Sequence, residues 1–335
     1  MKSSKKYFFL FIVILNLLII NGLYADREEP SLQAKIKRFI SNKMLARIDV
    51  WTALNTNNLN VFIATLRSGA DVNVTRKVYI IDPRSGTYER NESLLEVLVN
   101  NQDTEKLSAL LHANAMGFVT LDATKKYDAD DLPILIQAAK SSESITMSSI
   151  VDELVESYLK KEIELDIDAV DPETGNTAIM EAAQYPNSYV LTSFVDAIRY
   201  KGLSVDTNIK NKDDKTLIDL AFESERYDNN DNFEKILYAL GDGFLNYDFN
   251  TNIYDNGDNF IMRLARFPTF VDEIRLLLVA YQNRQISFDL NLKNNDGDTL
   301  STLLRVYMEE SSEYTELQDK FNFLKTLDNS TFITQ

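Results

Sequence analysis

Residues 206–221 read DTNIKNKDDKTLIDLA, and a close copy returns at residues 289–304 as DLNLKNNDGDTLSTLL. Half of the aligned positions are identical, and the shared Thr-Leu opens an apolar run in both copies. Internal self-similarity of this kind is the signature of a repeat architecture, in which each unit buries its apolar face against its neighbours. The sequence therefore predicts a stacked array of similar units.

Weaker copies precede and separate these two, as GADVN at Gly69, LDIDAVDPETGNTAIMEAA from Leu165 and FNTNIYDNGDNFIMRLA from Phe249. Apolar residues at three- and four-residue steps, such as Leu191, Phe194 and Ile198, predict that each unit holds amphipathic helices. Aligning the first helix of every copy gives starts that lie about 39 to 45 residues apart. These seven starts are Ile48, Ser93, Leu132, Thr177, Thr216, Asn259 and Thr299.

A second marker keeps the same spacing. A pair of Asp or Asn residues separated by one position precedes most of the new units, and such side chains hold tight turns by bonding nearby backbone N–H groups. The pairs are Asp71/Asn73, Asp166/Asp168, Asp206/Asn208, Asn250/Asn252 and Asp289/Asn291. In the second unit only Asp122 of the pair is present.

These motifs resemble the ankyrin repeat, whose pattern opens a first helix with D-x-x-G-x-T-P-L-H-x-A-A and closes with G-A-D-V-N. Residues 69–73 match the closing motif, and residues 174–183, TGNTAIMEAA, resemble the opening one. The resemblance implies an all-α dominated repeat solenoid, made of helix–turn–helix units joined by β-hairpin or loop fingers. It also implies a protein partner bound on the concave face. The units here are longer than the usual repeat of about 33 residues, and the Pro-Leu-His is lost.

The first unit carries a long insertion between Val74 and Asn91. Two runs rich in β-branched and aromatic residues, 78–81 and 87–89, flank Asp82-Pro83-Arg84-Ser85-Gly86, which predicts an enlarged β-hairpin finger. Tyr and Arg often anchor interfaces, so the finger supplies candidate partner-binding residues, although a hairpin Tyr can equally pack on its neighbouring strand. The candidates are Tyr79, Asp82, Arg84 and Tyr88, with Tyr254 and Asp255 in a later loop.

The first 25 residues differ from the rest. Lys2, Lys5 and Lys6 precede an apolar run over residues 7–20, which is the order of a secretory signal peptide, and Ala25 is the expected cleavage site. The sequence thus predicts export to a periplasm, cell surface or extracellular space. The alternative is an uncleaved membrane anchor. We expect a basic capping helix in 26–47, the repeat array in 48–327 and a tail in 328–335.

The chain has a formal net charge of −16, one His and no Cys. Such a chain has no disulfide framework, should repel nucleic acid, and favours a basic protein partner. The acidity can equally serve only to keep a long surface soluble.

Few residues suggest chemistry. His112 lies alone near a helix end, where its role is structural. Residues 293–298 carry oxygen ligands but break the calcium-loop pattern, so turn capping explains them better. We therefore expect no catalytic, metal or cofactor site, and a non-enzymatic scaffold that binds another protein. The alternatives are a membrane-tethered envelope structural or spacer protein and, less favoured, an acidic-loop hydrolase.

Overall fold

The computed structural model describes residues 48–56, 58–82, 86–125, 132–140, 144–185, 188–228, 231–250, 253–308 and 322. The expected signal peptide, the capping helix of 26–47 and the tail of 328–335 lie outside these residues. The chain divides into two compact units. Unit 1 comprises Met1–Ala129 with Lys160–Leu165, and unit 2 comprises Asp130–Leu159 with Asp166–Gln335.

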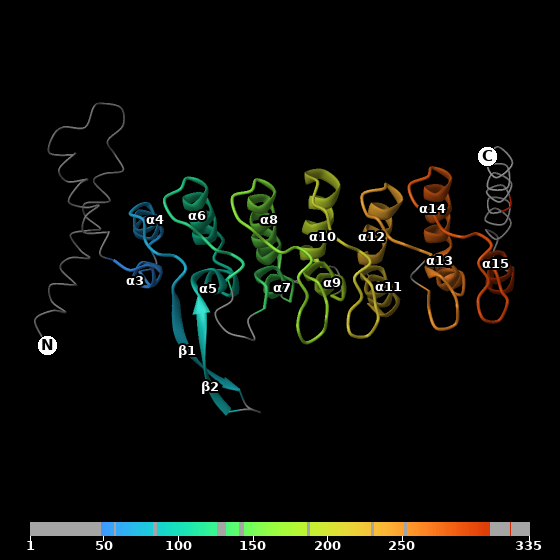
Figure 1. Ribbon diagram of the computed structural model, residues 1–335, viewed down its shortest axis with the longest axis horizontal. Coiled ribbons are helices and arrows are strands. Elements are labelled where there is room, and N and C mark those ends of the chain that lie inside the picture. The colour runs from blue at the N-terminus through green and yellow to red at the C-terminus, as the bar shows by residue number, and fades with distance from the viewer. Residues whose placement is uncertain are drawn as a thin grey trace, which may run out of the picture. The chain divides into compact units, whose positions relative to one another are not determined.

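The described part of unit 1 holds two helix pairs and a hairpin (Figure 1). The elements are α3 (Val50–Leu54), α4 (Leu59–Arg67), β1 (Thr75–Asp82), β2 (Gly86–Ser93), α5 (Leu94–Asn100) and α6 (Thr104–Ala115). The longer helices α4 and α6 pack together, and Phe62, Leu66 and Leu107 are fully buried. His112 lies in the last turn of α6, as predicted.

The finger is an antiparallel hairpin in which Thr75 pairs with Ser93 and Asp82 pairs with Gly86. Both strands are longer than the sequence predicted. The base of the hairpin is tied to the helices, because the Arg76 guanidinium lies 5.1 Å from the centre of the Trp51 ring and Arg90 bonds Glu96 at 2.7 Å. Ser93 ends the hairpin and begins α5 through a capping box with Glu96.

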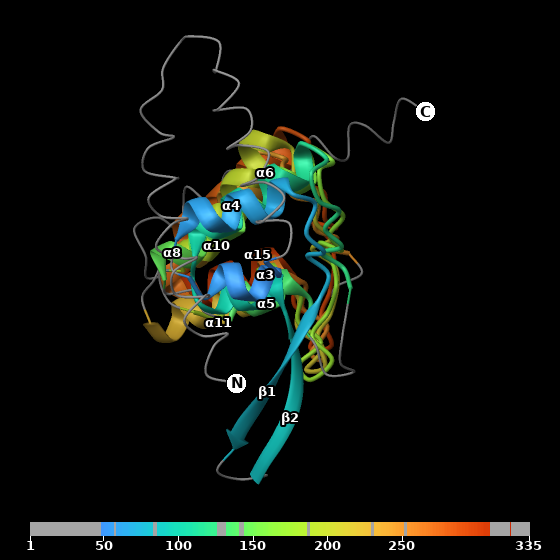
Figure 2. The same cartoon turned by 90° about the vertical axis from the view of Figure 1, so that its left-hand side faces the viewer.

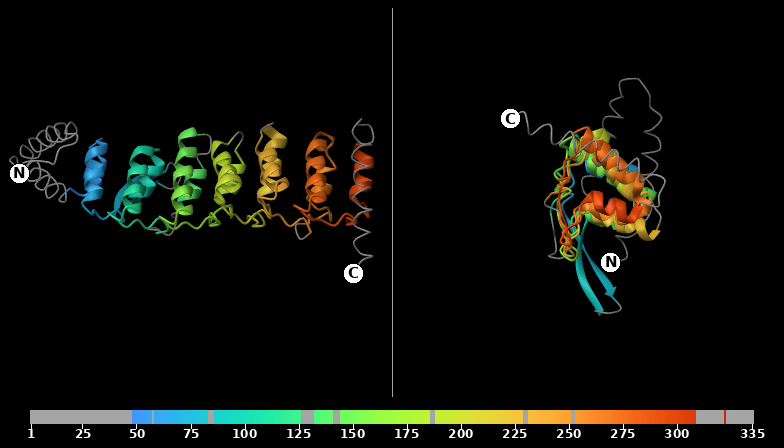
Figure 3. Two further views of the ribbon diagram at one scale, coloured as in Figure 1. Left: turned by 90° about the horizontal axis from the view of Figure 1, so that it is seen from above. Right: turned by 90° about the vertical axis from the view of Figure 1, so that its right-hand side faces the viewer.

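Unit 2 repeats the helix pair along its length (Figures 1 and 3). The first helices, α7, α9, α11, α13 and α15, form one row, and the second helices, α8, α10, α12 and α14, form another. The first row is Ile134–Ala139, Ala178–Ala183, Leu217–Asp228, Phe260–Leu264 and Leu300–Met308. The second row is Ile145–Leu159, Tyr189–Asp196, Asn232–Gly241 and Val271–Gln282. A π-helical turn, Ala197–Lys201, extends α10, and a 3-10 turn, Pro268–Phe270, precedes α14.

The expected repeat starts coincide with helix N-termini because short polar side chains cap them. Ser93, Thr177 and Asn259 each accept a backbone N–H three residues on, and Thr216 and Thr299 directly precede α11 and α15. Two starts were placed early. Asp49, not Ile48, caps α3, and Pro133, not Leu132, stands at the N-cap of α7.

The Asp and Asn pairs form a ladder from one repeat to the next. In three pairs the first side chain accepts the N–H of the second residue, and the second side chain accepts an N–H of the following repeat. These pairs are Asp71/Asn73, Asp206/Asn208 and Asp248/Asn250. Thus Asn208 Oδ1 accepts from Asp248 N–H at 2.8 Å, and Asn250 Oδ1 accepts from Asp289 N–H at 2.8 Å. The pairing Asn250/Asn252 was therefore wrong by two residues, since Asp248/Asn250 is the pair that the ladder uses.

Phenylalanine fills the core between α11, α12 and α13. The Phe222 ring lies 5.5 Å from Phe233, 5.9 Å from Phe260 and 5.0 Å from Phe270, measured between ring centres. The contacts with Phe233 and Phe260 are edge-to-face, an arrangement that adds to the stabilisation that comes from burial. Large aromatic rings therefore pack at this junction between repeats, next to the candidate site described below.

Candidate functional site

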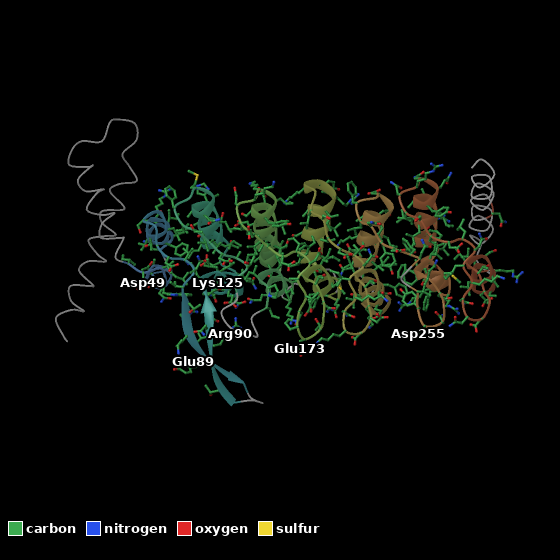
Figure 4. The ribbon with its side chains drawn as sticks, viewed as in Figure 1. Asp49, Glu89, Arg90, Lys125, Glu173 and Asp255 are labelled. Atoms are coloured by element: carbon green, nitrogen blue, oxygen red, sulfur yellow. The ribbon has the colours of Figure 1, made fainter. Side chains whose placement is uncertain are left out.

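Each first helix of unit 2 from α9 onward is preceded by a tight hairpin loop. Within each loop, the first residue donates its backbone N–H to the carbonyl of the last, at 2.8 or 2.9 Å. The four bonds are Asp171 N to Asn176 O, Asn211 N to Lys215 O, Tyr254 N to Asp258 O, and Asn294 N to Asp298 O. The shared bond puts Asp171, Asn211, Tyr254 and Asn294 at one structural position. The loops project on one side of the helices, where Glu173 and Asp255 are labelled in Figure 4. Figure 2 shows the loops from the end of the row.

Two of the three loop-to-loop junctions are closed by hydrogen bonds. Between the loops 171–176 and 211–215, Lys212 N donates to Thr174 O at 3.0 Å and Asn211 Nδ2 donates to Asn176 Oδ1 at 2.8 Å. The loops 254–258 and 294–298 repeat this pattern. There Asn295 N donates to Asn256 O at 2.9 Å, and Asn294 Nδ2 donates to Asp258 Oδ1 at 2.8 Å.

The close approach depends on glycine. Gly175 and Gly257 have φ values of 78° and 82°, and a Cβ at these residues would lie 2.9 Å from Lys212 N and 2.8 Å from Asn295 N. Real Cβ atoms do not come so near a backbone nitrogen. Glycine thus permits both the left-handed backbone and the contact with the next loop.

The middle junction, between loops 211–215 and 254–258, lacks these features. Asp214 takes the place of the glycine, with φ of 62° and a side chain where the next loop would approach. Tyr254 replaces the asparagine. Asp255 corresponds to Lys212 and Asn295, whose side chains donate to the preceding loop, but a carboxylate has no proton to donate.

Among the described residues of these two loops, no backbone hydrogen bond joins Asp255 to Asp213, although the equivalent bond forms at both other junctions. Three substitutions at corresponding positions have therefore opened one junction of the series.

A cavity of about 500 Å³ lies at the open junction. Its walls come from both loops and from the first helices behind them. The lining residues are Lys210, Asp213, Asp214, Lys215, Thr216, Asp219, Glu223, Tyr247, Ile253, Tyr254, Asp255, Asn256, Asp258, Arg263, Arg266 and Phe267. A neighbouring hollow of about 540 Å³ shares Asp213, Lys215 and Glu223 with it, so the two form one groove. We call this the loop groove.

Asp219 of α11 forms the floor of the cavity. Its carboxylate is 3% exposed, and its Oδ2 accepts from Thr216 N at 3.0 Å and from Thr216 Oγ1 at 2.7 Å. Its Oδ1 accepts from Arg263 Nη1 at 2.8 Å and from the Tyr254 hydroxyl. Four donors thus satisfy the buried charge, as burial of a carboxylate requires.

Arg263 is held between two rings. Its guanidinium carbon lies 5.0 Å from the centre of Phe222 and 4.6 Å from that of Tyr254, which is the range of cation–π attraction. Burial by itself would lower the pKa of Arg263, but the neighbouring Tyr254, Asp219 and Glu223 raise it. Burial, together with the charge of Asp219, raises the pKa of the Tyr254 hydroxyl, which therefore stays protonated and donates.

Tyr247 contributes a buried hydroxyl that makes no hydrogen bond of ordinary geometry. The side chain is 4% exposed. The hydroxyls of Thr216 and Tyr254 lie beside it, and each donates its own proton to Asp219. Burial raises the pKa of Tyr247, so this hydroxyl stays neutral.

The charges of the cavity do not balance. Each lining cation has a carboxylate partner, because Lys210 pairs with Asp214, Lys215 with Glu223, Arg263 with Asp219 and Arg266 with Asp258. Asp213 and Asp255 face solvent with no cation beside them among the described residues. The mouth of the cavity is thus negative, while its floor is neutralised.

The structure brings two of the sequence candidates to this site. Tyr254 and Asp255 line the cavity, but the Tyr254 hydroxyl is bonded inward to Asp219. Tyr79 lies on β1 of the finger and is 70% exposed. Asp82 ends β1, Tyr88 lies in β2, and Arg84 lies outside the described residues. Their role in binding stays a prediction.

Sequence reasoning missed Asp214, Asp219, Tyr247 and Arg263. The signal for Asp214 was present in the opening alignment, where DDKT at 213–216 stands against DGDT at 296–299. An aspartate in place of a turn glycine marks a changed loop. The turn-capping interpretation of residues 293–298 is confirmed, since Asn294 Oδ1 accepts from Asp296 N at 3.1 Å and Asp298 N at 2.8 Å.

No family model matches the sequence, and no curated protein matches it. Among solved structures, the chain resembles EF0377, an ankyrin repeat protein, with 18% identity and a TM-score of 0.43 over 68% of this chain and 96% of that one. It resembles the ankyrin repeat domain of Bcl-3 with 18% identity and a TM-score of 0.43, over 66% and 86% of the two chains. A third match comes from the complex of the predatory endopeptidase Bd0816 of Bdellovibrio bacteriovorus with immunity protein Bd3460, with 18% identity, a TM-score of 0.31, and coverage of 59% and 98%.

The internal geometry of the chain decides the fold. TGNTAIMEAA at 174–183 enters α9 through the Thr177 cap, and GADVN at 69–73 closes the α3–α4 pair with Gly69 at φ of 82°. Paired helices with one loop side recur in both units. The fold is the ankyrin-repeat fold. In this fold the loop groove lies between two adjacent ankyrin repeats, whose first helices start at Thr216 and Asn259. The hairpin loops and first helices of both repeats line it.

Proposed function

We propose that this chain is a non-enzymatic protein-binding scaffold whose partner seats in the loop groove. The observation that supports this most is the open middle junction. Closed loops would stabilise the array, since each closed junction gains hydrogen bonds from one loop to the next, typically about 1 kcal/mol each. A junction that gives up those bonds and exposes a cavity of about 500 Å³ with two unpaired carboxylates is better explained by binding than by stability.

The chemistry of the cavity floor favours binding over catalysis. Both oxygens of Asp219 are occupied by donors from Thr216, Arg263 and Tyr254. Asp258 is also saturated, by Arg266, Asn256 and Asn294. A carboxylate that serves as a general base needs an oxygen within reach of a substrate proton. These buried carboxylates are instead structural supports for the groove walls.

The finger is a second candidate surface, favoured by the exposure of Tyr79 on a strand that stacking does not require. A partner that grips the finger would use aromatic and charged side chains of an extended hairpin. The finger and the loop groove belong to different units, and each can be tested by itself.

We also propose that the protein is exported and cleaved after Ala25. The support is the order of Lys2, Lys5 and Lys6, the apolar run at 7–20 and the small residue at 25. Within the described residues no helix has the length and apolar character needed to cross a membrane. Mass spectrometry of the N-terminus decides this: an intact Met1 would favour the tethered envelope or spacer protein.

The binding proposal can be tested with single cysteines, because the chain has none of its own. Lys210→Cys places a thiol at the groove wall. Lys235→Cys is the matched control, since Lys235 likewise pairs with an aspartate four residues away but lies on α12 and lines neither hollow. Partners are captured by cross-linking from the producing cell, before and after each thiol is coupled to a bulky maleimide. Capture that the Lys210 label abolishes and the Lys235 label leaves intact supports the proposal. Capture that neither label affects contradicts it.

A further inference from the structure

We infer that the open junction is a receptor for one basic side chain, arginine or lysine, presented by an extended segment of the partner protein between Asp213 and Asp255. This inference rests on the proposed function, because it names the chemistry that the loop groove recognises. It goes beyond that function in assigning a subsite and the residues that would discriminate.

Two carboxylates, one from each loop, line the open junction. Asp213 belongs to the loop before α11, and Asp255 belongs to the loop before α13, so the two carboxylates approach an occupant from different repeats. Both are exposed, and neither has a cation partner among the described residues. A guanidinium presents five N–H donors in a planar fork, so it can bond two carboxylates at once.

The existing cations of the cavity do not compete. Arg263 and Arg266 are each fixed to a buried carboxylate, and Lys215 is held by Glu223 at 2.7 Å. The lining contains six carboxylates and four cations, which leaves a net negative charge. An anion would have to displace an ion pair that is already made, whereas a cation finds two carboxylates unpaired.

The hydroxyl of Tyr247 gives an independent indication of an occupant. It is buried, lines the cavity and makes no hydrogen bond of ordinary geometry. A buried polar group without a partner is costly, typically by about 1–3 kcal/mol. A donor brought in by a ligand would satisfy this oxygen, as the N–H groups of a basic side chain would.

The same two positions explain why, of the three junctions between the described loops of unit 2, only the middle one carries the subsite. Where the junction is closed, the residue corresponding to Asp255 is Lys212 or Asn295, and its side chain donates to the carbonyl of the preceding loop. Asp255 cannot make this bond and points a charge outward instead. Asp214, with φ of 62°, keeps the neighbouring loop from closing over it.

The test uses the full-length protein and a displayed library of short random peptides as the probe. Peptides that bind are first tested on the Lys210→Cys protein with and without the bulky maleimide label. Those whose binding the label blocks are the ones that occupy the groove. We expect these peptides to contain an arginine or lysine whose replacement by the uncharged analogue citrulline or norleucine weakens binding at least about tenfold, or roughly 1.4 kcal/mol.

The protein side is tested with Asp213→Asn/Asp255→Asn, which should weaken the same peptides at least about tenfold. The matched control is Asp196→Asn/Asp296→Asn, which removes the same charge from two exposed carboxylates that line neither hollow of the loop groove. This control should change affinity by no more than about twofold, as expected for a general field effect screened by salt. On the double variant, the citrulline peptide should bind as well as the arginine peptide, because the contact is already lost.

The outcomes separate the two proposals. Groove-bound peptides without a basic residue, or with affinities that neither Asp substitution changes, overturn the basic-side-chain inference and leave the proposed function standing. If no selected peptide is displaced by the Lys210 label, the groove is not a binding face and both proposals are wrong. An equal loss in both double variants also overturns the inference, since it shows attraction by net charge alone.

Discussion

The hydroxyl of Tyr254, in the loop before α13, donates to Oδ1 of Asp219 on α11, across the boundary between two repeats. At the corresponding position of the next loop, Asn294 reaches back only to Asp258, the last residue of the preceding loop. The longer side chain of Tyr254 passes the loop and reaches the helix. This contact replaces a loop-to-loop bond with a loop-to-helix bond, and it leaves the space between the two loops open.

Removing the Tyr254 hydroxyl should destabilise the protein. Tyr254→Phe leaves Asp219 with its bonds from Arg263 and Thr216 but removes one donor to a buried charge, which typically costs about 1.5–3 kcal/mol. Denaturant unfolding measures the loss. Tyr189→Phe is the control, because Tyr189 is exposed on α10 and should change stability by less than about 0.5 kcal/mol. Equal stabilities for Tyr254→Phe and wild type would show that the bond to Asp219 contributes nothing.

Two glycines should respond differently to the same substitution. Gly257 and Gly297 have φ values of 82° and 84°, so alanine is strained at both by about 1–2 kcal/mol. Only at Gly257 would the new Cβ meet the next loop, 2.8 Å from Asn295 N, while Gly297 has open space. We expect Gly257→Ala to lose at least about 1 kcal/mol more than Gly297→Ala in chemical unfolding. Losses of the same size would mean that the loops are not in close contact at this junction.

The aromatic core should carry much of the stability at the open junction. Phe222→Ala removes a fully buried ring that contacts Phe233, Phe260 and Phe270, and it should cost about 3–5 kcal/mol. Phe244 is 48% exposed, so Phe244→Ala serves as the control with a small expected loss. Calorimetry of both variants measures the difference. A minor loss at Phe222 would contradict the assignment of these rings to the core.

Stability should fall in acid through Asp258. Burial alone would raise the pKa of this carboxyl, but the bonds from Arg266, Asn294 and Asn256 outweigh burial and lower it. The folded-state pKa thus lies below the unfolded value of about 3.9. The stabilisation is fully present above that value and is lost as pH falls through the folded pKa.

Asp258→Asn should therefore be less stable than wild type near neutral pH, and the gap should narrow as the pH falls below about 4. Urea unfolding of both proteins across this range tests the expectation. The matched control is Asp296→Asn, which alters an exposed carboxyl in the next loop and should leave the pH profile unchanged. A gap that stays constant with pH would rule out a role for Asp258 ionisation.

The outer part of the finger should be dispensable for folding. Replacing residues 80–88 with an Asn-Gly turn keeps the base of the hairpin, where Arg76 lies over Trp51 and Arg90 bonds Glu96. We expect the melting temperature to stay close to that of wild type, because exposed loop tips tolerate deletion. If the finger is the anchor, partner capture should fall at least about tenfold. A large drop in melting temperature would show that the finger is part of the core, and unchanged capture would leave the loop groove as the binding face.

The sequence determined the parts of this protein that depend on local chemistry. Ser93, Thr177 and Asn259 cap helices because their side chains reach a backbone N–H three residues on, and that reach is set by neighbours along the chain. The finger was predictable for the same reason, since β-branched residues and a Pro-Gly-containing turn act locally. The spacing of the repeats was also predictable, because aligning the internal copies of the sequence was enough to obtain it.

Only the tertiary structure decided which loops touch and which do not. Tyr254 and Asp219 are 35 residues apart, and their contact depends on how one repeat stacks on the next. The effect of Asp214 is likewise invisible in its own loop, because the glycine it replaces matters through the backbone of the following repeat. The position of the cavity and the two carboxylates left unpaired at its mouth are therefore properties of the junction, where side-chain length and backbone approach are set by packing.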